Sequence, residues 1–432
     1  MIVDRQDDLR SIGKDLKVDG QGTEVRRELC LRCKGGKLLC GKSRCPITAQ
    51  ASAQSDIARK LSKDIASPSP PGFFVGWKGY PKVSLGPMGL AVPHEDPSFL
   101  DDPARWYGAT IQEVVGFRSL LVRSRESVDI HAARDPPATL RDYQDLVLSS
   151  RPVDVELHLR QVPRFHIAFS AIAQPMGPSA ELKSFDLVGN PAVPRAADKV
   201  TGDTDLRAEE GVANLFDAGM DVYHVQKVLS AGLLGRGKDR TLVPTRWAIT
   251  ATDDIVGRDL ADRLRDLPEL DEVLLFSNEY MGNHYEIILM PGPLEFEHLE
   301  SWEGGSVWGA GDGWTVVQEY EPTEGRTSYA AKQGGGYYAA RLAVYEALVR
   351  MGRQAVAVAL REIDKTYYLP VGVWEVRENV RRAMQDEPER FPDLKAALAA
   401  AAPRTGTGLK RWVSESSILK NRLYQRRLTS FF

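Results

Sequence analysis

Cysteine is scarce in this chain and confined to one short stretch. The 432 residues include four cysteines, Cys30, Cys33, Cys40 and Cys45, and none follows Cys45. A disulfide framework that staples the whole chain, as in small secreted domains, is therefore excluded. Stability must come from buried apolar side chains, and a hydrophobic content of 43% is enough for sizeable cores.

Long hydrophobic runs are also absent. Apolar runs such as 273–276 and 287–290 are far shorter than a membrane-spanning helix requires. Residues 1–20 are charged and lack the apolar segment of a secretion signal. We therefore expect a cytoplasmic protein with no membrane contact.

Familiar catalytic signatures are missing as well. The sequence has no P-loop, no HExxH motif, no nucleophile elbow and no Rossmann fingerprint. Function has to be inferred from other patterns, and charge is the first of them.

The charges nearly balance, with 56 Lys and Arg against 59 Asp and Glu, but basic residues gather at two ends. Residues 26–45 carry one acid, Glu28, and residues 409–432 carry one, Glu415, each among several Lys and Arg. Two basic ends thus flank an acidic body. This pattern favours local contact with a polyanion such as DNA over binding by the whole surface.

The four cysteines have the spacing C-x2-C-x6-C-x4-C. Four thiolates within reach of one another suit a tetrahedral metal site, and the glycines between them let the backbone turn tightly. We expect a structural Zn²⁺ held by Cys30, Cys33, Cys40 and Cys45, surrounded by basic side chains. A 4Fe-4S cluster is the alternative, because ligand number does not separate the two.

Hydrophobic periodicity predicts an α+β fold with mixed or antiparallel sheets and packed helices. Strands are predicted in several segments that alternate or are continuously apolar: 73–89, 153–162, 166–174, 180–189, a hairpin over 271–292 turning near Met281, and 314–322. Helices are predicted where apolar residues repeat every three or four positions: 52–65, 111–123, 206–219, 221–232, 255–267 and 335–351.

Composition shifts predict four regions. They are the cysteine region 1–50, a helix and Pro-rich linker at 51–72, an α+β core at 73–404, and a flexible basic tail at 405–432. A subdivision of the core near 190–205 is an open option.

The chain ends on QRRLTSFF, which has the pattern Q-x-x-[LIM]-x-x-[FY]-[FY]. It resembles the motif by which proteins dock on the PCNA-type DNA sliding clamp. Leu428 and Phe431 are one 3₁₀ turn apart, so both emerge on one face beside Phe432, and Gln425 offers an amide to a rim pocket. The alternative is a C-terminal amphipathic helix that packs Ile418, Leu419, Leu423 and Leu428 on the protein's own core.

The chain resembles the archaeal Nre DNA-repair family. The resemblance rests on the cysteine cluster, on FVGWKGYPKVSLGP at 74–87, on the block at 229–254 and on the terminal motif. It implies a role in repairing damaged DNA, coupled to the sliding clamp, and carries no established catalytic motif. One departure is Trp77, where the family pattern leads us to expect arginine.

Six polar residues are candidates for a catalytic or phosphate-binding pocket. The candidates for catalysis are His166, Arg246, Asp253 and His284, and the candidates for phosphate binding are Arg164 and Arg341. Each has a structural alternative; Arg246, for example, could form a buried ion pair with Asp253 or Asp254.

These patterns predict a DNA-repair factor recruited by PCNA, with DNA and other repair proteins as partners and a position at the nucleoid. The alternatives are an enzyme acting on DNA or a nucleotide through the pocket, and a non-catalytic protein adaptor.

Overall fold

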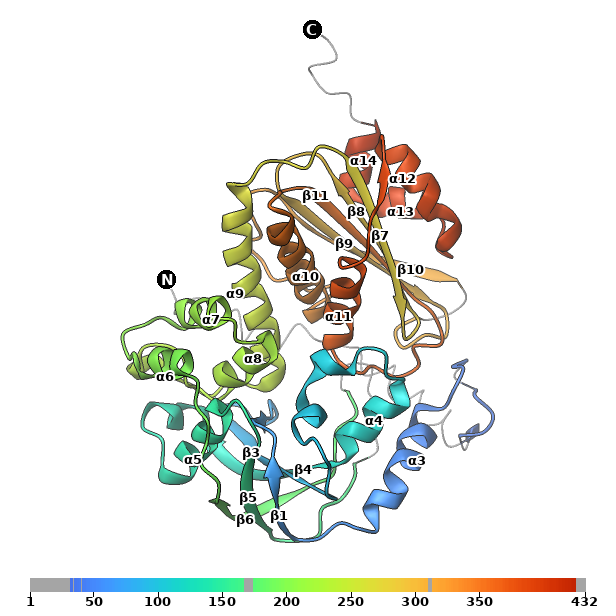
Figure 1. Cartoon of the computed structure of the whole chain (residues 1–432). Coiled ribbons are helices and arrows are strands. Elements are labelled where there is room, and N and C mark those ends of the chain that lie inside the picture. Colours follow the sequence, from blue (N-terminus) through green and yellow to red (C-terminus); the bar gives the residue numbers. More distant parts are fainter. Residues whose placement is uncertain (1–31, 34, 40, 167–173, 310–312, 425–432) are drawn as a thin grey trace. The chain divides into compact units, whose positions relative to one another are not determined.

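The computed structural model describes residues 32–33, 35–39, 41–166, 174–309 and 313–424 (Figure 1). The chain divides into two compact units: residues 1–48 with 260–432 form unit 1, and residues 49–259 form unit 2. The position near 190–205 lies inside unit 2. Among the described helices, none is long and apolar enough to cross a membrane.

Unit 2 is built on a six-stranded mixed sheet with the order β1-β5-β6-β4-β3-β2. Only β4 and β6 run parallel. The strands in chain order are β1 (Asp64–Ser69), β2 (Phe73–Val75), β3 (Lys82–Leu90), β4 (Leu121–Asp129), β5 (Val153–Leu159) and β6 (Ser179–Leu187). The helices that lie wholly or mostly in unit 2 are α3 (Pro46–Ala58), α4 (Ile111–Ser119), α5 (Ala138–Leu148), α6 (Arg195–Gly202), α7 (Ala208–Asp217), α8 (Val222–Ser230) and α9 (Thr245–Arg265), and the division between the units falls within α3 and α9.

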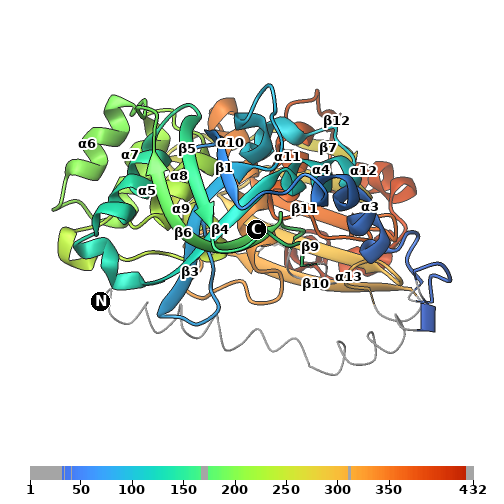
Figure 2. The same cartoon turned by 90° about the horizontal axis from the view of Figure 1, so that it is seen from below.

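The unit 2 sheet curls so that its edge strand β1 approaches β3 (Figure 2). The Leu90 amide donates to Ser67 Oγ at 3.0 Å across this approach. A Cβ on Gly89 would lie 2.7 Å from a methyl group of Leu157, so a larger residue here would require the Leu157 side chain to shift. The closed side of the curl buries Val83, Leu157 and their neighbours as the unit's core.

Unit 1 contains a second six-stranded mixed sheet with the order β10-β9-β11-β8-β7-β12. Its strands are β7 (Val273–Tyr280), β8 (Asn283–Met290), β9 (Glu295–Glu303), β10 (Trp314–Glu321), β11 (Val356–Ile363) and β12 (Glu389–Phe391). The central strand β11 pairs parallel with β9 and antiparallel with β8, and all its residues are buried.

Helices cover both faces of the unit 1 sheet (Figure 1). On one face lie α10 (Gly335–Met351) and α11 (Trp374–Ala383), where the rings of Tyr345 and Phe296 meet edge to face at 5.9 Å. On the other face lie α12 (Leu394–Ala401), α13 (Leu409–Glu415) and α14 (Ser417–Tyr424). This second layer packs Leu398, Trp412 and Leu419 against the sheet.

The segment 405–424, predicted as the start of a flexible tail, forms α13 and α14. Ile418 and Leu419 are buried in the unit 1 core and Leu423 packs against it, as the amphipathic-helix alternative requires. Buried Glu297 on β9 accepts the amide hydrogens of Ser417 at 2.6 Å and Ile418 at 3.1 Å, which caps the start of α14 with negative charge. The eight residues of the terminal motif lie outside the described residues.

The predicted α+β class with mixed sheets is confirmed, while three helix predictions need correction. The predicted helix 52–65 ends at Ala58, because Ile65 instead pairs opposite Leu157 in the sheet. The predicted helix 111–123 ends at Ser119, where β4 begins. The helix predicted at 255–267 starts at Thr245, so Asp253 and Asp254 lie within α9 and not at its N-cap.

The predicted Pro-rich linker 51–72 also contains β1. Pro68 lacks an amide hydrogen, which an edge strand tolerates. The predicted strand at 166–174 falls almost entirely outside the described residues.

Candidate nucleic-acid interface

The connection between β2 and β3 presents two aromatic rings to solvent. We call residues 76–82 the aromatic loop. Trp77 is 42% exposed and Tyr80 38%, and Lys78 and Lys82 beside them are also exposed. Gly79 has φ +87° and its carbonyl accepts the Lys82 amide at 3.0 Å, which makes the tight turn. Rings this large are uncommon on a surface unless something covers them.

The first turn of α9 braces the aromatic loop. The Arg246 guanidinium lies 5.4 Å from the centre of the Trp77 ring, and the rings of Trp247 and Tyr80 are 5.3 Å apart. The Val75 amide donates to Thr245 Oγ1 at 2.9 Å, which ties β2 to the start of the helix. The loop is therefore held by α9, and a cation lies against one of its rings.

Exposed rings interleaved with cations suit unpaired nucleotides. Bases of any sequence stack on aromatic faces, and arginine or lysine contacts the phosphates. The bases of a duplex are already stacked on one another, so single-stranded or unstacked DNA is the better match for exposed rings.

Two of the four cysteines lie within the described residues. Backbone N–H groups of Leu39 and then Lys37, Gly35 and Leu38 lower the pKa of the Cys33 thiol, against the effect of burial. A Cβ on Gly35 would lie 3.7 Å from Cys45 Sγ, so both sulfurs border the turn at Gly35, whose φ is +76°. The ionised form of Cys33 is favoured, and the sulfur of Cys45 borders the same turn. Both features fit a turn that binds a metal ion. Cys30 and Cys40 lie outside the described residues.

The cysteine segment is anchored on unit 1. Lys42 is buried, and its Nζ donates to the Ser306 carbonyl at 2.9 Å. Ser43 Oγ donates to the Lys365 carbonyl at 3.0 Å. Of the basic side chains that the structure describes here, Arg32, Lys37 and Arg44 are exposed, whereas Lys42 serves packing.

The six residues predicted to line a pocket divide between the units. Arg164 and His166 lie in unit 2 and are exposed, and Arg246, which lies beside Trp77, belongs to the same unit. Asp253, also in unit 2, is fully buried and accepts from Gln226 Nε2 at 3.2 Å, while Asp254 pairs with Arg258 at 3.1 Å.

The other two residues lie in unit 1, in different surroundings. His284 contacts Glu286 at 2.8 Å, and Arg404 contacts the same carboxylate. Arg341 is buried and donates to Glu321 at 2.7 Å. Both side chains therefore contact internal carboxylates of the sheet, and neither unit contains the whole predicted set.

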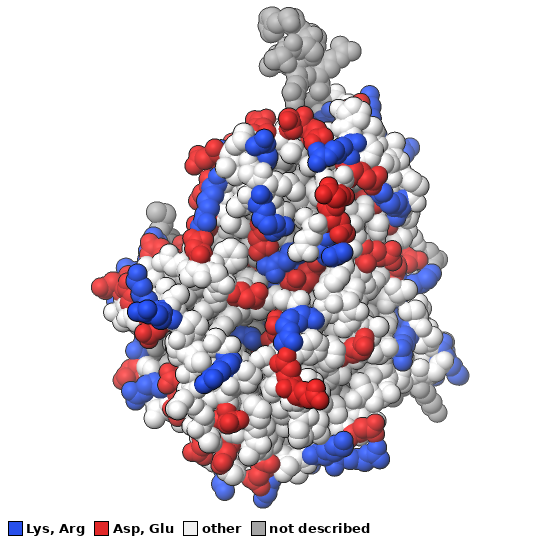
Figure 3. All heavy atoms as spheres, in the orientation of Figure 1, with Lys and Arg blue, Asp and Glu red and all other residues white. Residues whose placement is uncertain are grey.

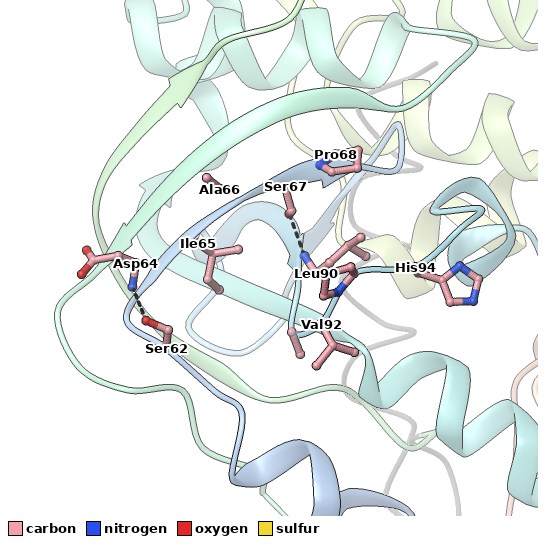
Figure 4. A pocket seen from close by; sticks show the side chains of 11 residues that line it. Ser62, Asp64, Ile65, Ala66, Ser67, Pro68, Leu90, Val92 and His94 are labelled. Carbon is pink, nitrogen blue, oxygen red and sulfur yellow. Dashed lines mark hydrogen bonds between the residues drawn. The ribbon is translucent and has the colours of Figure 1, made fainter.

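A hollow of unit 2 does not resemble a reaction site (Figure 4). It opens between β1 and the end of β3, with a volume of about 280 Å³. Its polar groups already have partners: Ser67 accepts from Leu90, and Asp64 lies 2.8 Å from His158. We assign no chemistry to it.

Charges of both signs intermingle on the face drawn in Figure 3, so no single basic surface stands out there. A local group of cations does precede the terminal motif QRRLTSFF. Lys410, Arg411 and Lys420 are exposed on α13 and α14, and Tyr424, the last described residue, is 76% exposed.

Two known family models match this chain. Residues 39–309 match the model described as archaeal Nre, N-terminal, and residues 321–431 match archaeal Nre, C-terminal. The chain belongs to the archaeal Nre family. The C-terminal Nre match continues to residue 431 and so includes all but the last residue of the terminal motif.

Three Nre relatives are similar over most of their length. DNA repair protein NreA of Archaeoglobus fulgidus is 39% identical over 89% of this chain and 95% of its own. DNA repair protein NreB of the same organism is 35% identical over 93% of this chain and 99% of its own length. DNA repair protein NreA of Haloferax volcanii is 37% identical over 79% of this chain and 84% of its own length. No solved structure matches the chain.

Sequence reasoning on this Nre chain singled out Trp77 and Arg246 but missed Tyr80 and Trp247. The FVGWKGYP block contains a signal for the aromatic loop. Two aromatic residues and a lysine stand between glycines, and glycine has no side chain that could cover them. Their meeting with α9, 166 residues or more along the chain, has no local signature.

Proposed function

We propose that this protein is a DNA-repair factor that is recruited by the PCNA-type sliding clamp and holds unpaired DNA on its aromatic loop. The observation that carries the proposal is the exposure of Trp77 and Tyr80 with Arg246 beside the Trp77 ring. The printed names of its relatives, DNA repair proteins NreA and NreB, support the repair role. Such a factor would work at the nucleoid.

Recruitment is assigned to the last eight residues. Gln425, Leu428, Phe431 and Phe432 supply the amide and three apolar anchors of a clamp-docking peptide. Because α14 is packed up to Leu423, the motif begins directly after an anchored helix with exposed cations. Those cations would lie close to DNA that passes through the ring.

A structural Zn²⁺ is proposed at Cys30, Cys33, Cys40 and Cys45. The lowered pKa of Cys33 and the place of Cys45 Sγ beside Gly35 fit thiolate ligation. The metal would fix the fold of a segment too short to have its own core. It has no role in a reaction here.

The zinc proposal predicts one Zn²⁺ per chain by elemental analysis and a colourless protein; a brown protein containing iron would select the 4Fe-4S alternative. Cys33→Ser should lose the metal while unit 2 keeps its unfolding transition, because no residue of unit 2 is a ligand. Ser43→Ala, which leaves all four thiols, is the matched control. Full metal content in the Cys33 variant would contradict the assignment.

The aromatic loop predicts a specific loss of DNA binding. Each stacked base contributes about 1–3 kcal/mol by alanine substitution. Trp77→Ala should therefore weaken binding of a single-stranded oligonucleotide roughly tenfold, and Trp77→Ala with Tyr80→Ala further, as measured by fluorescence anisotropy at fixed salt. Tyr424→Ala removes a more exposed ring outside the loop and should change little. Equal loss of DNA binding in Trp77→Ala and Tyr424→Ala, or no loss in Trp77→Ala, would contradict the assignment.

The enzyme and adaptor alternatives lead to different results in the same assays. Turnover of DNA or a nucleotide that is lost on His166→Ala would favour the enzyme. The absence of DNA binding by the intact protein would favour the adaptor. The predicted pocket remains a hypothesis, since its residues divide between the two units.

A further inference from the structure

Three arginines gather on α4 and β4 of unit 2. Arg118 lies in the last turn of α4. A capping box of Thr110 and Glu113 stabilises the start of this helix. Arg123 and Arg125 are two residues apart on β4, so they share one face of the sheet. The structure thus brings three guanidinium groups to neighbouring positions.

Aromatic rings hold two of these guanidinium groups. The Arg118 guanidinium lies 4.9 Å from the centre of the Trp106 ring, and that of Arg123 lies 5.2 Å from the centre of the Phe74 ring. Stacking restricts the side chains, so little further entropy would be lost when they bind a ligand.

Each of the three arginines keeps a buried nitrogen unused. Within the described part of the chain, Nε of Arg118, Arg123 and Arg125 has no hydrogen-bond partner. The one hydrogen bond described for their other nitrogens runs from Arg123 Nη2 to the Gly177 carbonyl at 3.3 Å. A buried donor without an acceptor is costly, and such groups in native proteins usually mark a missing ligand or water.

Nearby carboxylates are engaged elsewhere. Asp101 pairs with Lys227 at 2.6 Å, and Glu126 accepts from the Tyr143 hydroxyl at 2.6 Å. Glu181, opposite Arg125 in the β4–β6 register, lies 4.0 Å from Arg160. No ion pair to any of the three arginines is found among the described residues; Asp101 acts on Arg118 without pairing with it, and its charge opposes the lowering of the Arg118 pKa.

The charge state is consistent with this picture. Burial lowers the pKa of Arg118 to about 10. Burial, and then the charges of Arg125 and Arg118, lower the pKa of Arg123 to about 10. Both remain protonated near pH 7, and a bound anion would raise both pKa values again.

Two copies of the tripeptide Pro-Met-Gly enclose the strand that carries the cluster. The first, at 87–89, lies in β3 on one side of β4, where the Pro87 carbonyl accepts from Ser124 Oγ at 2.7 Å. The second, at 175–177, leads into β6 on the other side. A Cβ on Gly177 would lie 2.0 Å from the Leu121 carbonyl oxygen, so only glycine allows this approach.

We propose that Arg118, Arg123 and Arg125 form a binding site for a phosphate group. Planar guanidinium groups match the oxygens of phosphate in pairs, and a multiply charged anion would satisfy both the unused donors and the excess charge. The phosphate belongs either to a free anion such as pyrophosphate or to the end of a DNA strand. The site does not depend on the clamp or on the aromatic loop.

The test measures pyrophosphate binding by calorimetry at low ionic strength. The intact protein should bind, and Arg123→Gln and Arg125→Gln should each weaken binding about tenfold or more. Arg141→Gln removes an exposed arginine of α5 with the same change in charge and should weaken it less than twofold. Arg123→Lys keeps the charge but loses the planar fork, so it should also bind more weakly than the intact protein.

Two further arms identify the source of the phosphate. A 5′-phosphorylated oligonucleotide that displaces pyrophosphate better than its 5′-hydroxyl form would show that DNA ends use the site; equal displacement would assign it to free anions. Trp77→Ala should leave pyrophosphate binding unchanged, which separates this site from the proposed DNA platform. No pyrophosphate binding by the intact protein, or equal loss in the Arg123→Gln and Arg141→Gln proteins, would overturn the proposal.

Discussion

Replacing Phe431 and Phe432 with alanine should reduce affinity for a PCNA-type clamp by at least about 100-fold. Burying each ring contributes about 1.5–3 kcal/mol, and about 1.4 kcal/mol is tenfold in affinity. Titration calorimetry of the full-length protein against the purified clamp measures the loss. The chain that ends at Tyr424 should lose binding completely.

The fold supplies the control for this experiment. The described chain ends with α14, which Glu297 caps and whose Leu419 is buried, so removing 425–432 leaves the packed helix intact. The unfolding midpoint should stay the same. Tyr424→Ala alters an exposed ring directly before the motif and should keep clamp binding. Unchanged affinity of the double alanine variant would contradict the docking proposal.

Removing the buried charge of Arg361 should destabilise unit 1 by about 3–5 kcal/mol, since breaking a buried ion pair leaves a carboxylate uncompensated. Arg361 on β11 donates to Glu300 at 2.6 Å, to Glu375 at 3.0 Å and to Asn283 at 2.7 Å. Arg361→Met therefore leaves two buried carboxylates, Glu300 of β9 and Glu375 of α11, without their cation. Denaturant unfolding measures the change in the free energy of unfolding.

The loss should depend on pH in a defined direction. Burial raises the pKa of Glu375, and Arg361 opposes that rise. Without Arg361 the folded-state pKa rises further above the unfolded value, so the charged form becomes more costly in the folded protein. The penalty is absent below the unfolded pKa and grows as pH increases through the folded one. Arg361→Met should therefore lose more stability at pH 8 than at pH 5.

An exposed ion pair provides the comparison for Arg361. Arg382 pairs with Asp386 at 3.2 Å, with both side chains half exposed. Arg382→Met should cost less than about 1 kcal/mol, because exposed pairs contribute little. Similar losses in both variants, or a greater loss for Arg361→Met at pH 5 than at pH 8, would contradict the buried-network account.

The sequence predicted local elements well where pattern and turn chemistry agree. The alternation of 153–162 predicted β5, and Met281 with Gly282, at φ +52° and +71°, forms the predicted hairpin turn. Helical spacing was misleading where sheet pairing competes with it. Ile65 lies at a helical interval from Ile57 but is buried opposite Leu157 in the sheet.

Long-range organisation had no local signal. The N-terminal Nre match supplies β7, β8 and β9, and the C-terminal match supplies β11, which lies between β8 and β9. The two family regions therefore share one sheet, although the sequence places them apart. The proposed phosphate site has no local signal for the same reason: Arg118, Arg123 and Arg125 are ordinary cations until the partners of nearby carboxylates are known.

The most direct test of the account is binding to a clamp loaded on DNA with a single-stranded gap. If the terminal motif and the aromatic loop act together, the intact protein should bind this assembly at least about tenfold more tightly than the clamp or the gapped DNA alone, because the first contact makes the second intramolecular. Removing 425–432, or replacing Trp77 and Tyr80 with alanine, should each abolish that gain. Affinity for the loaded clamp no greater than for the better single partner would contradict the account.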